Sequence, residues 1–177
     1  MQPQQKIKVL VIDDSKVSRI VLTGIFETVD DFELVGTATD GATGLDAVRE
    51  LKPDVITLDL AMPNVDGFEF LDRLKEESQT PVIVVSSQSR AAAVMEALDR
   101  GATDFIAKIG AFHEGEPSVF FRESVLEKCR VAVGIWGNRS SFEEVGRQLP
   151  VDGTEDDSNG DIITKVICVG ASTGGPG

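Results

Sequence analysis

Short apolar runs alternate along the chain with longer segments in which apolar residues recur at helical spacing. The runs are rich in Val, Ile and Leu, which is typical of strands in a sheet that is covered on both faces. This alternation predicts repeated βα units around a parallel sheet. The five predicted strands span residues 7–12, 32–38, 55–58, 82–85 and 104–107.

A helix is predicted after each strand. The first helix is expected to turn one apolar face inward, formed by Val17, Ile20, Val21, Gly24 and Ile25. The others are predicted at 42–51, 67–77, 90–100 and 119–133. Because βα crossovers are right-handed, the pattern predicts an α/β fold with a doubly wound five-stranded parallel sheet between two helical layers.

The character of the sequence changes after residue 133. Residues 134–161 contain Gly, Pro, Ser and Asn and the acidic stretch DGTEDDSNGD at 152–161, a composition that predicts a linker. Residues 162–169 (IITKVICV) restore a strand pattern, and 170–177 (GASTGGPG) follow as a Gly-rich turn. We expect one domain over 6–133, followed by an extended or disordered tail.

Length and charge narrow the classes of function. A chain of 177 residues with 41% hydrophobic residues has room for one ordinary domain and part of another, but hardly for two complete enzymatic domains. The formal net charge is −13. This charge disfavours non-specific binding to nucleic acid, because the phosphate backbone attracts clustered Lys and Arg.

Cysteine and histidine are scarce. Cys129, Cys168 and His113 are too few for a disulfide scaffold or a zinc site, so we expect two structural thiols in a reducing compartment. The first 30 residues do not resemble a signal peptide, and no stretch approaches the roughly 20 apolar residues of a membrane span. We therefore expect a cytoplasmic protein without membrane insertion.

Polar side chains stand where the predicted strands end. Asp13 and Asp14 follow the first strand, Asp59 the third, Ser86 the fourth and Lys108 the fifth. Alone, each has a structural explanation as a helix cap, a turn former or a solvated charge. Because the carboxyl ends of parallel strands share one rim, where ligands bind, their joint placement instead predicts a functional site.

The residue types at this rim suit phosphoryl chemistry. Crowded carboxylates repel one another, and a hard cation such as Mg²⁺ relieves that repulsion. A carboxylate can also attack phosphorus to form an acyl phosphate, and Asp59 is the best candidate, with Ser86 and Lys108 placed to hold the added oxygens. Neither a P-loop nor a G-x-G-x-x-G motif is present, so the sequence shows no nucleotide-binding loop as a phosphate donor site.

Four motifs bear a family resemblance. They are VLVIDDS at 9–15, ITLDLAMPNVDGFEF at 56–70, PVIVVSS at 81–87 and GATDFIAK at 101–108. With them, residues 6–133 resemble the receiver domain of two-component response regulators. The resemblance implies a flavodoxin-like fold and phosphoryl transfer from a histidine kinase to Asp59. It also implies that Ser86 and Lys108 bind the phosphoryl group and that Mg²⁺ is held by Asp13, Asp14, Asp59 and the backbone carbonyl of Ala61.

One further residue matches the family, and one departs from it. Phe105 matches the aromatic switch residue, whose rotamer follows Ser86 in the family, although a plain core role is the alternative. Family members usually carry Pro after the conserved Lys, but Ile109 stands there in this chain. Residues 109–118 (IGAFHEGEPS) replace the common short loop, which puts the geometry of this loop in question.

The last residues bear a second resemblance. KVICVGASTGGPG at 165–177 resembles the opening strand and nucleophile turn of chemotaxis-type protein-glutamate methylesterases, in which a receiver and a linker come first. The resemblance implies Ser172 as the esterase nucleophile, although a flexible end or a phosphate loop is the alternative. The esterase triad also needs a His and an Asp farther along, and His113 is expected in a surface loop instead. We therefore expect 162–177 to be the truncated start of an esterase domain, inactive as an esterase.

These observations leave two hypotheses open. In the first, a chemotaxis-type histidine kinase phosphorylates the receiver, which controls a methylesterase effector that acts on chemoreceptors. In the second, the chain is a stand-alone or differently coupled response regulator that signals through protein contacts. A DNA-binding output is disfavoured by the acidic linker and by the GASTGGPG end.

Overall fold

The computed structural model describes residues 5–108, 111–113 and 116–146. A parallel sheet has the order β2-β1-β3-β4-β5, and its strands are β1 (Ile7–Ile12), β2 (Phe32–Ala38), β3 (Val55–Leu58), β4 (Val82–Ser86) and β5 (Asp104–Ala107). The helices are α1 (Lys16–Glu27), α2 (Gly41–Leu51), α3 (Gly67–Glu77), α4 (Ala91–Asp99) and α5 (Val119–Gly146). The predicted doubly wound α/β fold is confirmed.

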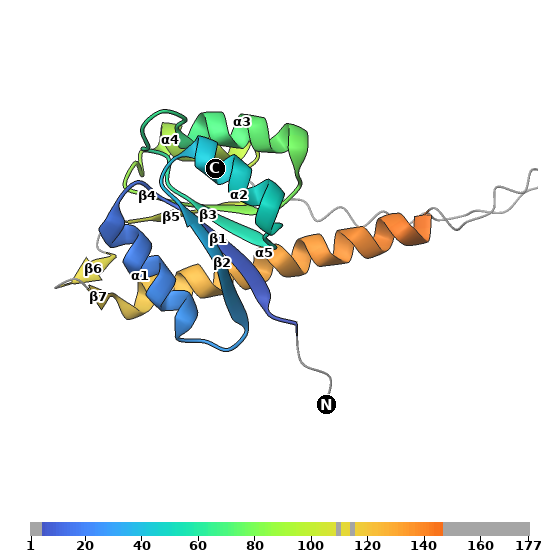
Figure 1. Ribbon diagram of the computed structural model, residues 1–177, viewed down its shortest axis with the longest axis horizontal. Coiled ribbons are helices and arrows are strands. Elements are labelled where there is room, and N and C mark those ends of the chain that lie inside the picture. The colour runs from blue at the N-terminus through green and yellow to red at the C-terminus, as the bar shows by residue number, and fades with distance from the viewer. Residues whose placement is uncertain (1–4, 109–110, 114–115, 147–177) are drawn as a thin grey trace, which may run out of the picture.

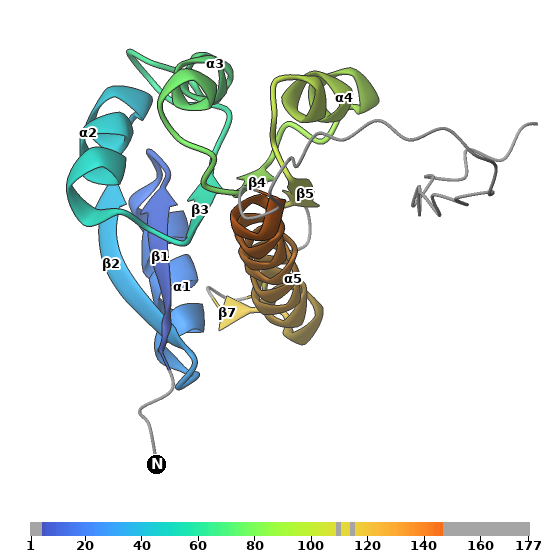
Figure 2. The same ribbon diagram turned by 90° about the vertical axis from the view of Figure 1, so that its right-hand side faces the viewer.

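Helices cover both faces of the sheet. Helices α2, α3 and α4 lie on one side, and α1 and α5 lie on the other (Figures 1 and 2). Successive side chains of a strand point to opposite faces. Leu10 and Ile56 therefore pack in the core beneath α2, α3 and α4, whereas Val9 and Val55 pack in the core beneath α1 and α5. The strands are buried on both faces, as their continuous apolar runs predict.

The strand order brings the ends of β1 and β3 together. The chain moves outward from β1 to β2 and then crosses to β3 on the other side of β1. Ile12 pairs with Leu58, so the next residues, Asp13 and Asp59, emerge side by side. Such a switch point is where open α/β sheets bind their ligands.

The buried face of α1 differs from the prediction. Val17 and Ile20 were expected to face inward, but each is 61% exposed. The apolar residues that α1 buries are Val21, Leu22, Ile25 and Phe26. The helix carries two adjoining apolar stripes, and the one with the larger side chains packs on the sheet.

Helix α5 passes the predicted boundary. The sequence predicts its end at residue 133 and a linker from residue 134, but the helix continues to Gly146. Its second half extends beyond the sheet in Figure 1. The glycines of this segment suggested a linker, although single glycines cost a helix only about 1 kcal/mol relative to alanine.

A small hairpin precedes α5 and was not predicted. Strands β6 (Phe112–His113) and β7 (Glu116–Pro117) pair antiparallel within the segment that replaces the short family loop. Strand β7 lies against α1. Two-residue strands are too short to leave a periodic pattern in the sequence.

No helix in the described part of the chain has the length and the apolar character needed to span a membrane.

Candidate functional site

The structure brings the predicted rim residues together. Oxygen atoms from the carboxylates of Asp13, Asp14 and Asp59 all lie within 4.8 Å of one another. Asp13 and Asp59 are buried, whereas Asp14 is exposed. The cluster is therefore an acidic site that opens to solvent on the side of Asp14.

Lys108 joins the two buried carboxylates. Its Nζ donates to Oδ2 of Asp13 and to Oδ2 of Asp59, both at 2.6 Å. The lysine side chain is only 9% exposed. Its position is fixed by β5, because the Lys108 amide donates to the carbonyl of Ser86 on the neighbouring strand. A cation thus sits between two acids that would otherwise repel each other.

The other oxygen of Asp59 is bound by Ser86. The Ser86 hydroxyl donates to Asp59 Oδ1 at 2.7 Å and accepts from the Gln88 amide at 3.2 Å. The Ala61 amide also donates to Asp59 Oδ1, at 3.3 Å. Ser86 is the last residue of β4 rather than the first residue after it, and it is fully buried. Both oxygens of Asp59 are therefore held by donors.

Burial shapes the titration of Asp13. Burial raises the pKa of the Asp13 carboxyl above its usual 3.8, and the negative charge of Asp59 raises it further. The hydrogen bond and the charge of Lys108, together with the Ser15 amide, act in the opposite direction. Added positive charge is favourable where buried acids gather in this way.

The donor set suits Mg²⁺. Three carboxylates supply hard oxygen ligands, and the exposure of Asp14 leaves room for the water ligands that Mg²⁺ usually keeps. Ala61, whose backbone carbonyl the resemblance adds to this set, lies in the loop directly after β3. The residues that are present therefore fit this ion.

Gly67 is a contributor that our sequence reasoning missed. A Cβ atom at this position would lie 2.5 Å from the carbonyl oxygen of Asp59 and 2.6 Å from Cα of Leu60. The Gly67 amide donates to the carbonyl of Leu60 at 3.0 Å. Only glycine allows α3 to begin this close to Asp59. The Asp66-Gly67 pair before a helical pattern was the available sequence signal.

Arg19 is the second missed contributor. Its Nη1 donates to the backbone carbonyls of Asp13 at 2.7 Å and Asp14 at 2.8 Å. No spacing rule marks an arginine six residues after an aspartate, so the sequence held no signal for this contact.

The remaining predicted residues lie elsewhere. Phe105 pairs with Val84 in the sheet, is partly buried against the core beneath α2, α3 and α4, and lines a pocket of about 310 Å³ at the start of α5. Its switch role stays a prediction. Ile109 and Ser172 lie outside the described residues. His113 lies in β6, where it pairs with Glu116 of β7.

Sequence comparisons agree with this geometry. Residues 9–115 match the family described as the response regulator receiver domain. A protein-glutamate methylesterase/protein-glutamine glutaminase of Thermotoga maritima is 39% identical over 175 residues, which cover 96% of this chain and 48% of that protein. One from Geobacter sulfurreducens is 37% identical over 194 residues, which cover 97% and 51%. The chain spans about half the length of these curated relatives.

Solved structures show the same fold. The response regulator domain of CheB from Thermotoga maritima has a TM-score of 0.64 and 42% identity, over 73% of this chain and 98% of that chain. A chain of the CheX-CheY-BeF3-Mg complex from Borrelia burgdorferi has a TM-score of 0.59 and 28% identity, over 70% and 87%. Family match, relatives and fold converge, and this chain belongs to the response regulator receiver family.

Proposed function

We propose that this receiver accepts a phosphoryl group from the phosphohistidine of a histidine kinase onto Asp59, with Mg²⁺ as cofactor. The observation that carries the proposal is the environment of Asp59. Ser86 and Lys108 each bind one of its oxygens at 2.6–2.7 Å, and two further carboxylates stand beside it. A carboxylate held between a hydroxyl, an ammonium and a pair of acids is suited to receiving a phosphoryl group.

The transfer forms one bond and breaks one. An oxygen of Asp59 bonds to phosphorus while the bond from phosphorus to the histidine nitrogen breaks, and the histidine leaves as the neutral ring once its nitrogen is protonated. Lys108 then neutralises the phosphoryl oxygens, and the Ser86 hydroxyl donates to one of them instead of to the carboxylate. Asp13, Asp14, Asp59 and the Ala61 carbonyl would hold Mg²⁺, which supplies further charge neutralisation when bound.

The effector is proposed from the relatives. Proteins named protein-glutamate methylesterase/protein-glutamine glutaminase match nearly the whole chain. We therefore propose that a receiver at 6–133 controls a methylesterase domain that begins near 162 and uses Ser172 as nucleophile. Residues 134–146 of α5 form the first portion of the 134–161 connection. A cytoplasmic chemotaxis kinase as donor and chemoreceptors as targets complete this proposal.

Phosphorylation by acetyl phosphate tests the assignment without a kinase. Intact mass spectrometry should show one added phosphoryl group on the wild-type chain in the presence of Mg²⁺ and none after chelation. Asp59→Asn should stay unmodified. Asp54→Asn is the matched control, because Asp54 binds the Lys8 amide at the opposite end of β3, and it should behave as wild type. Equal modification of wild type and Asp59→Asn would sink the proposal.

A further inference from the structure

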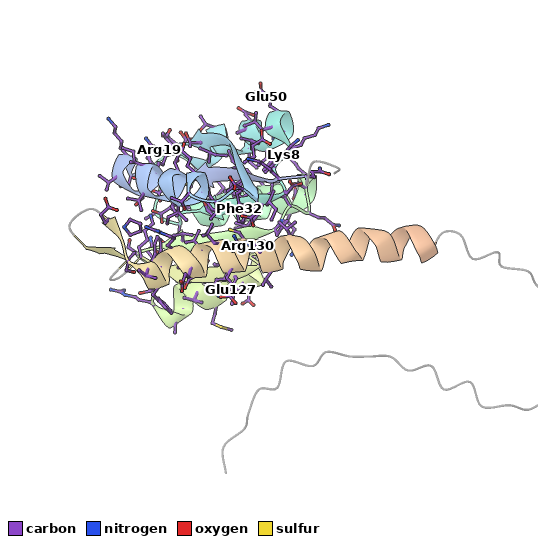
Figure 3. All side chains as sticks on the ribbon, turned by 90° about the horizontal axis from the view of Figure 1, so that it is seen from below. Lys8, Arg19, Phe32, Glu50, Glu127 and Arg130 are labelled. Atoms are coloured by element: carbon purple, nitrogen blue, oxygen red, sulfur yellow. The ribbon has the colours of Figure 1, made fainter. Side chains whose placement is uncertain are left out.

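We propose that Arg19 is a positioning residue that sets the geometry of the Mg²⁺ site by holding the backbone of Asp13 and Asp14. This inference rests on the proposed function of the acidic cluster. It concerns a side chain of α1 that touches neither the phosphoryl group nor the metal. Arg19 is labelled on this helix in Figure 3.

The contact spans the loop between β1 and α1. Only residues 13–15 separate the strand from the helix, and the first two of them are metal-ligand candidates. Nη1 of Arg19 places one N–H on the carbonyl of Asp13 at 2.7 Å and the other on the carbonyl of Asp14 at 2.8 Å. Two successive carbonyls bound by one nitrogen fix the peptide plane between them, and with it the direction of both side chains.

The two aspartates depend on Arg19 to different degrees. Asp13 is also held by the Ser15 amide and by Lys108 through its carboxylate. Asp14 is exposed, and the hydrogen bond that ties it to another side chain in the described part of the chain is the one from Arg19. Loss of Arg19 should therefore loosen Asp14 first.

The electrostatic surroundings of position 19 do not favour an arginine. It is the fourth residue of α1, near the positive end of the helix dipole, where a cation is disfavoured. Its charge would also repel a metal ion at the neighbouring cluster. The hydrogen bonds to the two carbonyls offset these costs. We therefore infer that these contacts explain why an arginine stands at this position.

The charge of Arg19 and its hydrogen bonds predict opposite changes in Mg²⁺ affinity when the side chain is removed. If charge alone mattered, Arg19→Ala would tighten Mg²⁺ binding, because it removes a nearby cation. If Arg19 positions the ligands, the same substitution weakens binding by about tenfold, a loss typical of residues that orient metal ligands. Lys16→Ala is the matched control, because Lys16 is an exposed cation that begins the same helix.

The experiment is titration calorimetry of the full chain with MgCl₂, with circular dichroism to show that each variant is folded. We expect Arg19→Ala to bind about tenfold more weakly, Lys16→Ala to bind as tightly as wild type or slightly tighter, and Arg19→Lys to fall between. Raising Mg²⁺ should restore the extent of phosphorylation of Arg19→Ala by acetyl phosphate, because Asp59 itself is intact.

Each other outcome counts against the inference. Equal or tighter binding by Arg19→Ala overturns it, as does equal weakening by Lys16→Ala. If Arg19→Ala does not fold, Arg19→Lys decides, since it keeps the charge but replaces the planar donor group; wild-type affinity would then overturn the inference. If the wild-type chain binds no Mg²⁺, the proposed function is wrong as well. If the wild-type chain binds Mg²⁺ and Arg19→Ala binds it equally well, only the inference about Arg19 is wrong.

Discussion

Helices α4 and α5 lie on opposite faces of the sheet beside β5, yet they are held very differently, although α4 is the more apolar of the two in sequence. Among the side chains of α5 that the structure describes, at 119–134, those of Phe121, Val125, Leu126, Cys129 and Ala132 are buried. Helix α4 buries only Ala97 among its nine residues, while Met95 is 58% and Leu98 39% exposed. Apolar composition alone therefore does not decide how firmly a helix packs.

The helix caps deepen this contrast. Helices α1, α2 and α3 each have an N-cap residue whose side chain accepts a hydrogen bond from a backbone N–H of the first turn; the three residues are Ser15, Asp40 and Asp66. The N-cap of α4 is Arg90, which makes no such bond. A missing cap and little burial both lower the cost of local opening. The helix that directly follows Ser86 is thus the least firmly held one next to the site.

Truncation of one large side chain on each helix gives the largest expected difference. Phe121→Ala should lower the free energy of unfolding by about 3–5 kcal/mol, because Phe121 is 3% exposed in the core beneath α1 and α5. Leu98→Ala on α4 should cost less than about 1 kcal/mol, in the range of surface substitutions. Urea titrations of both variants measure the two losses, and similar losses would remove the contrast.

The next largest expected difference between α4 and α5 is in the reactivity of a thiol on each helix. Burial raises the pKa of the Cys129 thiol from 9.0 to about 12, so its labelling by iodoacetamide should be slowed by about a thousandfold. A thiol introduced on α4 as Met95→Cys should react at the rate of an exposed cysteine. Both rates are measured in a Cys168→Ser background, with guanidinium-unfolded protein as the reference. Rapid labelling of Cys129 in the folded chain would contradict the firm packing of α5.

The smallest expected effect comes from removing Arg130, which anchors the surface of α5 to the neighbouring residues Asp31 and Phe32. Arg130 binds Asp31 at 2.6 Å and stacks over the ring of Phe32, and both Arg130 and Phe32 are labelled in Figure 3. Because the ion pair is about 44% exposed, Arg130→Ala should cost only about 0.5–1 kcal/mol.

This anchor should respond to pH with a defined sign. The Arg130 hydrogen bond holds the pKa of Asp31 below its usual 3.8. The stabilisation by the pair is therefore complete above pH 3.8 and is lost as the pH falls through the lower pKa of the folded state. Urea titrations of wild type and Arg130→Ala at pH 7 and pH 3 measure the difference, which should shrink at the lower pH. A difference that stays the same at pH 3 would show that stacking on Phe32, rather than the ion pair, dominates.

The sequence predicted the sheet well and the helices less well. Strands buried on both faces read as unbroken apolar runs that stop at a polar residue, so their ends are marked to within one residue, as at Ser86 in β4. The buried stripe of α1 was misplaced at Val17 and Ile20, because two apolar stripes compete and only packing against the sheet selects one. The continuation of α5 past residue 133 was missed because composition resembles a linker there.

The site was predicted as a set of residues but not as a network. Strand ends placed Asp13, Asp59, Ser86 and Lys108 on one rim, because parallel strands share that edge. The bridge from Lys108 to Asp13 joins residues 95 positions apart, and no local pattern encodes such a contact. The carbonyl contacts of Arg19 likewise exist only once the loop has folded.

The most direct test of the central claim is to locate the phosphoryl group. The wild-type chain is phosphorylated with acetyl phosphate and Mg²⁺, the acyl phosphate is reduced with borohydride to homoserine, and the modified peptide is sequenced by mass spectrometry. We predict homoserine at position 59 and at no other aspartate, with none formed when Mg²⁺ is chelated. Homoserine at another acidic residue, or phosphate on a serine that survives borohydride, would contradict the assignment of Asp59.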